Sequence, residues 1–175
     1  MMTRQELARK IFETAHLTGT FLLRSGVTSS EYFDKYRFES DPVLLAEISR
    51  QMAELLPKQF DAQAGLEMGG IPIATGISFN SGKPTVFVRK KAKAYGTCQI
   101  AEGIEISGKE LVIIEDVVTS GGQVVISTQE LRERGASIKT ALCVIDREAG
   151  GKEALAAIGI ELIPLFTMSE IKALL

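Results

Sequence analysis

The chain has 175 residues, with 20 lysines and arginines against 22 aspartates and glutamates, and its formal net charge is −2. This balance argues against a nucleic-acid-binding protein, and no apolar run approaches the roughly 20 residues that a membrane-spanning helix needs. The length suits one domain with a single core, and two cysteines without metal-ligand or redox spacing favour a reducing, cytoplasmic setting.

The first third of the chain predicts two helices separated by strand and loop. Thr3 and Glu6 have capping-box spacing, which predicts a helix over residues 3–16. Residues 18–34 have no sustained helical period, and we interpret them as strand and loop. An aspartate followed by a proline then favours a helix over about 42–56.

From residue 62 onward, short apolar runs alternate with helical patterns. Strands are expected at 62–66, 85–88, 111–114, 139–145 and 160–165, and helices at 73–78, 124–134, 152–158 and from 169. The polar, glycine-bearing segment 91–103 is expected to be a loop. This alternation predicts an α/β fold, with a parallel sheet covered by helices on both sides.

The central segment 111–123, LVIIEDVVTSGGQ, combines a buried strand, two acids and a hydroxyl-rich turn. Glu115 and Asp116 are expected where the strand ends, at the sheet edge where such folds bind ligands. Residues 119–122 precede a helix, and a helix N-terminus with free backbone N–H groups favours a phosphate. Because carboxylates repel a bare phosphate, the pattern favours a ligand with nearby hydroxyls or a metal, such as ribose 5-phosphate.

This segment alone leaves another interpretation open. A buried strand followed by exposed acids and a turn also occurs in α/β proteins that bind nothing there. The turn lacks the lysine of a Walker loop and the spacing of a dinucleotide-binding turn. Further segments must therefore decide between the two interpretations.

Three other segments carry anion-binding chemistry. Residues 65–72 form a glycine-rich turn that permits close backbone approach to an anion. Residues 89–93, RKKAK, place cations at a strand end, and Arg147 follows another strand, where it offers a planar fork to a carboxylate. Together with the acids, these segments predict two anion sites with carboxylates between them, which suits 5-phosphoribosyl-1-diphosphate (PRPP).

The segment 115–123 resembles the signature of the type I phosphoribosyltransferases. Residues 19–34, 88–96 and 145–148 resemble the orotate phosphoribosyltransferases within that family, so the resemblance spans about 19–150. It implies a type I phosphoribosyltransferase fold, with a central parallel sheet flanked by helices and residues 1–175 as a single domain. A small hood is then expected from about residues 1–40 plus the C-terminal segment.

The resemblance also implies a PRPP site built from the basic strand end, the glycine turn and the central signature. Its expected members are Arg89, Lys90, Lys93, Tyr95, Met68, Gly69, Gly70, Glu115, Asp116, Val117, Val118, Thr119, Ser120, Gly121, Gly122 and Gln123. Glu115 and Asp116 are expected to bind the ribose hydroxyls, and both are expected to be catalytic together with Lys93.

For the base, the resemblance implies contacts from both ends of the chain. The expected orotate-binding residues are Thr119, Arg147, Arg24, Tyr32 and Phe33, with Arg147 pairing with the orotate carboxylate. Arg24 stands where the family commonly has lysine, and Tyr95 where it often has histidine. Both replacements keep a hydrogen-bonding side chain.

The activity implied is transfer of the phosphoribosyl group from PRPP to orotate, giving orotidine 5′-monophosphate and diphosphate in pyrimidine biosynthesis. Mg²⁺ is the expected cofactor, held mainly by substrate and water rather than by protein ligands. A homodimer with a shared active site is implied, and neither a nucleic-acid nor a membrane partner is expected. A phosphoribosyltransferase for another base and a non-catalytic PRPP-binding regulator remain alternatives.

Overall fold

The structure is a computed structural model, and it describes residues 1–22, 26–91 and 100–174. Its main sheet consists of β3 (Ala62–Leu66), β4 (Thr85–Val88), β5 (Ala101–Glu102), β6 (Glu110–Val118), β7 (Ser137–Asp146) and β8 (Glu161–Thr167). The strand order is β5-β4-β3-β6-β7-β8, and every neighbouring pair is parallel except β4 and β5. The predicted α/β fold with a central parallel sheet is confirmed.

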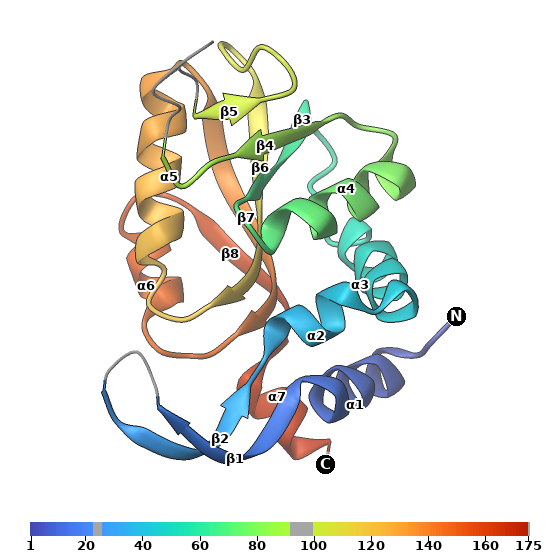
Figure 1. Ribbon diagram of the computed structural model, residues 1–175. Helices are drawn as coiled ribbons and strands as arrows, with labels where there is room; N and C mark the ends of the chain where they lie inside the picture. Colours follow the sequence, from blue (N-terminus) through green and yellow to red (C-terminus); the bar gives the residue numbers. More distant parts are fainter. Residues whose placement is uncertain (23–25, 92–99, 175) are drawn as a thin grey trace.

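Helices cover both faces of this sheet (Figure 1). α3 (Pro42–Ala53) and α4 (Gly70–Ser81) lie on one face, and α5 (Gly122–Glu133) and α6 (Gly151–Ala156) lie on the other. β6 contributes side chains to the apolar clusters on both faces of the sheet. Leu111 and Ile113 belong to one cluster, and Val112 and Ile114 belong to the other. An apolar strand that packs on two layers explains the continuous hydrophobic run in the sequence.

The N- and C-terminal segments lie together at one end of the main sheet (Figure 1). They comprise α1 (Arg4–Ala15), the antiparallel pair β1 (His16–Leu22) and β2 (Thr28–Phe33), α2 (Lys35–Ser40) and α7 (Met168–Ala173). Aromatic contacts join them, since the Phe33 ring lies 6.4 Å from both the Phe12 and Phe38 rings. We call this group of elements the hood.

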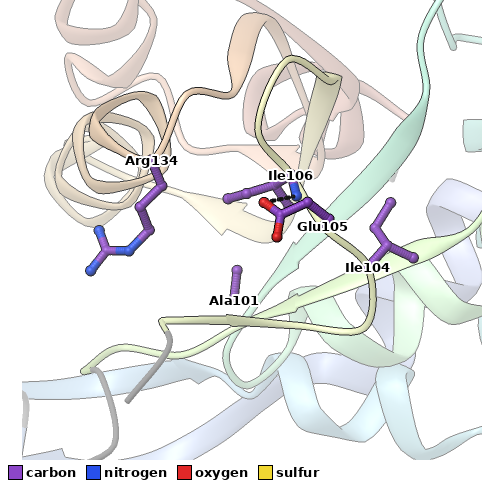
Figure 2. Close-up of a pocket in the computed structure, with 5 residues that line it drawn as sticks. All are labelled: Ala101, Ile104, Glu105, Ile106 and Arg134. Carbon is purple, nitrogen blue, oxygen red and sulfur yellow. Dashed lines mark hydrogen bonds between the residues drawn. The ribbon is translucent and has the colours of Figure 1, made fainter. Parts of the chain in front are cut away.

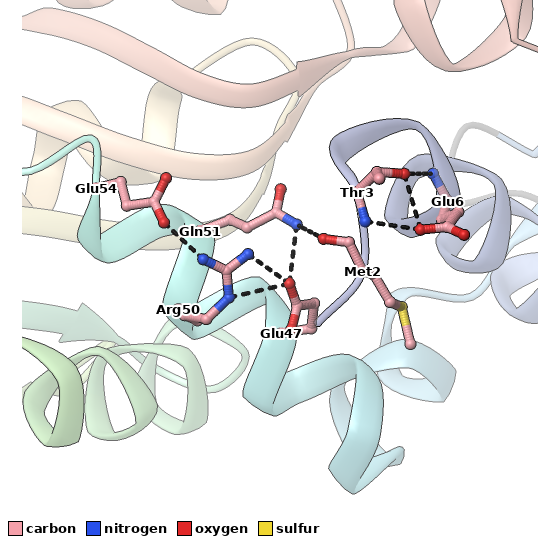
Figure 3. Close-up of polar contacts among 7 residues, drawn as sticks. All are labelled: Met2, Thr3, Glu6, Glu47, Arg50, Gln51 and Glu54. Carbon is pink, nitrogen blue, oxygen red and sulfur yellow. Dashed lines mark hydrogen bonds and ion pairs between the residues drawn. The ribbon is translucent and has the colours of Figure 1, made fainter.

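The start of α1 is held by polar contacts, as Figure 3 shows. The Thr3 hydroxyl accepts the Glu6 N–H at 3.2 Å, and the Glu6 carboxylate accepts the Thr3 N–H at 2.8 Å, which confirms the predicted capping box. The Gln51 amide donates to the Met2 carbonyl at 3.1 Å and to Glu47 at 3.1 Å. These bonds fasten the N-terminus of the hood to α3.

The structure adds two elements that the sequence analysis did not predict. α2 has six residues and no room for a helical period, and β5 has two residues that pair with β4. Both are too short for a periodic pattern, and their positions depend on contacts with distant parts of the chain. Among the residues that the structure describes, no helix is both long and apolar enough to cross a membrane.

Candidate active site

The carboxyl ends of β3, β4, β6 and β7 meet at one edge of the sheet, and most predicted site residues follow them. Hydrogen bonds join neighbouring ends. The Glu67 N–H donates to the Val88 carbonyl at 2.8 Å, and the Arg147 N–H donates to the Val118 carbonyl at 2.9 Å. Because open α/β sheets bind ligands outside the carboxyl ends of their strands, this edge is the candidate active site.

β6 holds the two predicted acids inside the sheet instead of beyond its end. The prediction that the strand ends at Glu115 is wrong, since the pairing with β7 continues to Val118 and Asp146. Two β-branched valines after the acids favour this extension. Glu115 is only 9% exposed and Asp116 is fully buried.

Two residues of α2 flank Asp116, and the sequence analysis identified neither. The Lys35 ammonium lies 2.6 Å from Asp116 Oδ2. A Cβ added at Gly69 would lie 1.7 Å from that oxygen and 2.7 Å from Glu39 Oε1, so both acids border this glycine. Lys35 and Glu39 are four residues apart on one helix, and this spacing puts both on one face. The four-residue spacing of Lys35 and Glu39 is visible in the sequence. Their proximity to Asp116 is not, because β6 lies far from α2 along the chain.

The buried cluster shifts the pKa values of its acids in different directions. Burial raises the pKa of Glu115 well above its usual range, and neighbouring Asp116 raises it further. Burial likewise raises the pKa of Glu39 to about 8, again with help from Asp116. Burial also acts to raise the pKa of Asp116, but its hydrogen bond with Glu115 and the Lys35 ammonium outweigh burial and lower it. The cluster thus favours the charged form of Asp116 and disfavours the charged form of Glu115.

The turn after β6 exposes hydroxyls in front of α5. Thr119 and Ser120 are exposed, and Gly121 has a φ of +75°, in the left-handed region that favours glycine. A Cβ at Gly121 would lie 2.7 Å from a Leu155 methyl group, so α6 packs tightly against this turn. Within the described chain, no side chain caps the N-terminus of α5. Its first N–H groups therefore have no partner within the helix and face the turn.

The glycine turn and the basic strand end lie side by side. The Glu67–Met68 peptide bond is cis, and α4 begins at Gly70, three residues earlier than predicted. The Lys90 N–H donates to the Glu67 carboxylate at 2.9 Å. Arg89 lies 3.6 Å from the Glu102 carboxylate. The two predicted anion-binding segments are thus in direct contact.

A cavity of about 440 Å³ lies between the hood and the end of β7. Its lining brings together three of the predicted orotate-binding residues, Tyr32, Phe33 and Arg147, which come from opposite ends of the chain. The other lining residues are Phe12, His16, Ser29, Glu31, Met168 and Lys172. Thr119 is not among them, although Arg147 is bonded to the strand end just before it. Aromatic rings and cations around one hollow suit a planar, anionic ligand.

Three predicted site residues, Arg24, Lys93 and Tyr95, lie outside the residues that the structure describes. A second hollow, of about 230 Å³, is shown in Figure 2 between the segment after β5 and the end of α5. It is lined by Ala101, Ile104, Glu105, Ile106 and Arg134. None of the predicted site residues belongs to this lining, so the sheet edge remains the candidate site.

Comparisons with known proteins show the family to which the chain belongs. A family model described as the phosphoribosyl transferase domain matches residues 41–164. The chain is similar to the orotate phosphoribosyltransferase of Nocardioides sp., at 48% identity over 95% of this chain and 93% of the relative. It is also similar to that of Pyrococcus furiosus, at 38% identity over 96% of this chain and 94% of the relative.

Solved structures share the fold. The orotate phosphoribosyltransferase of Aeropyrum pernix is 32% identical, with a TM-score of 0.83, over 95% of this chain and 96% of that one. The Mycobacterium tuberculosis enzyme in complex with PRPP is 26% identical, with a TM-score of 0.83, over 97% of this chain and 98% of that one. The similarity therefore extends over almost the full length of both chains.

Proposed function

The chain belongs to the phosphoribosyltransferase family, and from this membership we propose that it is an orotate phosphoribosyltransferase. This enzyme is a pentosyltransferase of pyrimidine biosynthesis, and it moves the phosphoribosyl group from PRPP to orotate, releasing diphosphate. The cavity that joins Arg147 to Tyr32 and Phe33 carries the proposal, because it offers a cation and aromatic rings to a carboxylated base beside the phosphate-binding edge.

The 5-phosphate of PRPP binds at the turn Thr119–Gln123. Exposed hydroxyls and the N-terminus of α5 support this assignment, since free N–H groups and the helix dipole both favour an anion. Val117 and Val118 contribute backbone at the start of the same turn. Gly121 has the left-handed backbone that brings these N–H groups together.

Glu115 and Asp116 bind the ribose hydroxyls and act in catalysis. Burial favours the neutral form of Glu115, which can donate a hydrogen bond, while Lys35 favours the charged form of Asp116, which accepts one, so the pair can hold two neighbouring hydroxyls. Breaking the bond between ribose and diphosphate develops positive charge on the sugar. The buried negative charge of Asp116 stabilises that charge by fixed electrostatics.

The diphosphate binds between the glycine turn, Met68 to Gly70, and the basic strand end. Lys90 donates its N–H to Glu67 directly before that turn and Arg89 is its neighbour in sequence, while Lys93 and Tyr95 are assigned to the same site by family resemblance. Lys93 is the proposed catalytic cation. We propose further that the enzyme is a homodimer in which a neighbouring subunit supplies part of this basic segment.

Orotate binds in the hood cavity with its carboxylate on Arg147. A guanidinium forms two parallel hydrogen bonds to a carboxylate, which orients the base as well as holding it. Tyr32 and Phe33 pack on the ring, and Thr119 and Arg24 complete the site by family resemblance. The attack then comes from a ring nitrogen of orotate onto the ribose carbon that carries the diphosphate.

We propose that a Mg²⁺ ion would be held mainly through substrate. Among the described residues no group of three histidine, cysteine or acidic side chains is placed to hold a metal, and Asp116 already faces Lys35. The ion neutralises charge on the departing diphosphate when bound. Diphosphate, ribose hydroxyls and water would supply oxygen ligands to the ion, in keeping with the preference of Mg²⁺ for oxygen.

We also propose that residues 1–175 work as a single domain, with the hood closing the base side of the site. Contacts from α1 and α2 to α3 support this proposal. The proposed location is the cytoplasm, which the free thiol of buried Cys143 supports.

The test is an assay of orotate absorbance with purified protein, PRPP and Mg²⁺. Loss of absorbance that requires both PRPP and Mg²⁺ is expected. A panel of other bases runs beside it. Turnover of a purine with orotate inactive would overturn the choice of base, and PRPP binding without turnover of any base would favour a regulator.

A further inference from the structure

Lys35 makes a contact for which the proposed mechanism gives no reason. Its ammonium lies 2.6 Å from Asp116 Oδ2, while the Lys35 side chain is 33% exposed and that of Asp116 is fully buried. A lysine ammonium that lies against a buried carboxylate loses hydration, and its side chain loses rotamer freedom. The charge attraction of Asp116 compensates for both losses.

The backbone connects Lys35 to the base cavity as well. Lys35 is the first residue of α2, whose N-cap is Asp34, and Tyr32 and Phe33 of the cavity lining immediately precede that cap. The Asp34 carboxylate accepts the Tyr36 N–H at 3.2 Å, which fixes the start of the helix. The same short segment therefore reaches both the base cavity and the acid on β6.

The Asp116 carboxylate is held from several sides. One oxygen accepts the Val117 N–H, the other faces Lys35, and Gly69 leaves no space for a side chain beside it. A carboxylate oxygen has more than one acceptor position, so these contacts leave capacity for a ligand hydroxyl.

We propose that Lys35 is a positioning residue for phosphoribosyl transfer, which acts through Asp116 by keeping that carboxylate ionised and fixed toward the ribose. This inference rests on the proposed function, because it assigns Asp116 to the sugar. Lys35 touches neither substrate nor reacting atoms in this assignment. Its effect passes through the acid that it holds.

The surrounding charges explain why the cation is needed. α2 contributes Glu39 and its N-cap Asp34, and the Tyr36 ring centre lies 5.3 Å from the Lys35 ammonium. β6 contributes Glu115 beside Asp116. β7 contributes Asp146 and the Cys143 thiol, whose pKa is raised by burial and then by Asp146, Glu115 and Asp116. Apart from Lys35, these groups are neutral or acidic, so without its ammonium Asp116 would keep its proton to higher pH.

The main experiment compares kcat/KM for PRPP across pH in wild type, Lys35→Met and Lys35→Arg. Lys35→Met is expected to move the acid limb of the profile upward by about 1–3 pH units, because the cation that favours ionised Asp116 is gone. Lys35→Arg is expected to restore the wild-type limb. Lys35→Gln serves as a second uncharged variant if Lys35→Met does not fold, and the same upward shift is expected.

Lys139→Met is the matched control. It also removes a lysine from an ion pair with β6, at 3.0 Å from Glu110, but at the opposite end of that strand. Its profile is expected to superpose on that of wild type. An unshifted acid limb in the uncharged Lys35 variants, or an equal shift in Lys139→Met, would overturn the inference.

A double-mutant test separates an action through Asp116 from a general effect on the fold. PRPP binding is measured by calorimetry for wild type, Lys35→Met, Asp116→Asn and the double variant. Lys35→Met is expected to weaken binding by about tenfold in the parent and to have little further effect in Asp116→Asn. Equal losses in both backgrounds would refute the inference. An inactive wild type that still shows this non-additive binding would refute only the proposed function.

Discussion

Arg147 follows β7 and lines the hood cavity together with Tyr32 and Phe33. Arg147→Ala is expected to raise KM for orotate by about 10- to 100-fold, since a hydrogen bond to a charged group contributes about 1.5–3 kcal/mol. KM for PRPP should change far less, because the PRPP phosphate is assigned to another turn. Steady-state kinetics with each substrate varied in turn gives both constants. Arg134→Ala, on the far end of α5, is the control, and equal changes in both KM values would contradict the assignment.

Gly69 is a residue whose lack of a side chain shapes the site. An added Cβ would lie 1.7 Å from Asp116 Oδ2, so Gly69→Ala must displace the acid or the turn. We expect PRPP affinity to fall by about tenfold or more, as measured by calorimetry. Gly159→Ala is the control, since no atom lies within 4 Å of its added Cβ and its cost is about 1 kcal/mol of backbone strain at a φ of +73°. Unchanged affinity in Gly69→Ala would show that Asp116 can move freely.

The Thr3 cap at the N-terminus of α1 is expected to contribute to the stability of the fold. Thr3→Ala removes the hydroxyl that accepts the Glu6 N–H at 3.2 Å and is expected to lower the free energy of unfolding by about 0.5–2 kcal/mol. Denaturant unfolding followed by circular dichroism measures the change. Thr18→Ala, on the exposed face of β1, should stay within about 0.5 kcal/mol of wild type. A loss in Thr3→Ala no larger than in this control would mean that the cap contributes nothing.

Elements that a local pattern determines were predicted well. β3 and β4 have the expected ends. β4, TVFV, is a run of strand-forming residues directly after a proline, whereas β3, AQAGL, has no β-branched or aromatic residue and pairs with a strand on each side. β6 is longer than predicted, since its two acids are polar in sequence but are buried by the elements on either side. α2 has no sequence pattern of its own, and its placement depends on Phe38 in the core and Lys35 on Asp116.

At the scale of the whole molecule, the sequence indicates candidate members of the site but not their arrangement in space. Tyr32 and Phe33 line the same cavity as Arg147, although more than a hundred residues separate them in sequence, and their contact with orotate stays a prediction. The predicted set omitted Lys35 and Glu39, because their importance arises from a contact between the hood and the sheet. A buried charge cluster of this kind follows from tertiary packing and leaves no periodic pattern in the chain.

The same cluster links the stability of the whole fold to pH through Glu39. Burial, then neighbouring Asp116, raises the pKa of Glu39 from 4.5 to about 8, so between these values the folded protein holds a proton that the unfolded chain has released. Stability therefore falls as pH rises through this window, by up to about 1.4 kcal/mol per pH unit for one proton.

Glu39→Gln cannot titrate and should lose this contribution to the pH dependence. Relative to wild type, the variant is expected to become steadily more stable from pH 4.5 to about 8, with no further relative change above that value. Denaturant unfolding at several pH values measures the difference, and Glu13→Gln, at an exposed site on α1, is expected to run parallel to wild type. Parallel curves of unfolding free energy against pH for Glu39→Gln and wild type, from pH 4.5 to 8, would mean that the Glu39 carboxyl is ionised in the folded protein. The buried cluster would then carry one more negative charge than the Lys35 ammonium can balance.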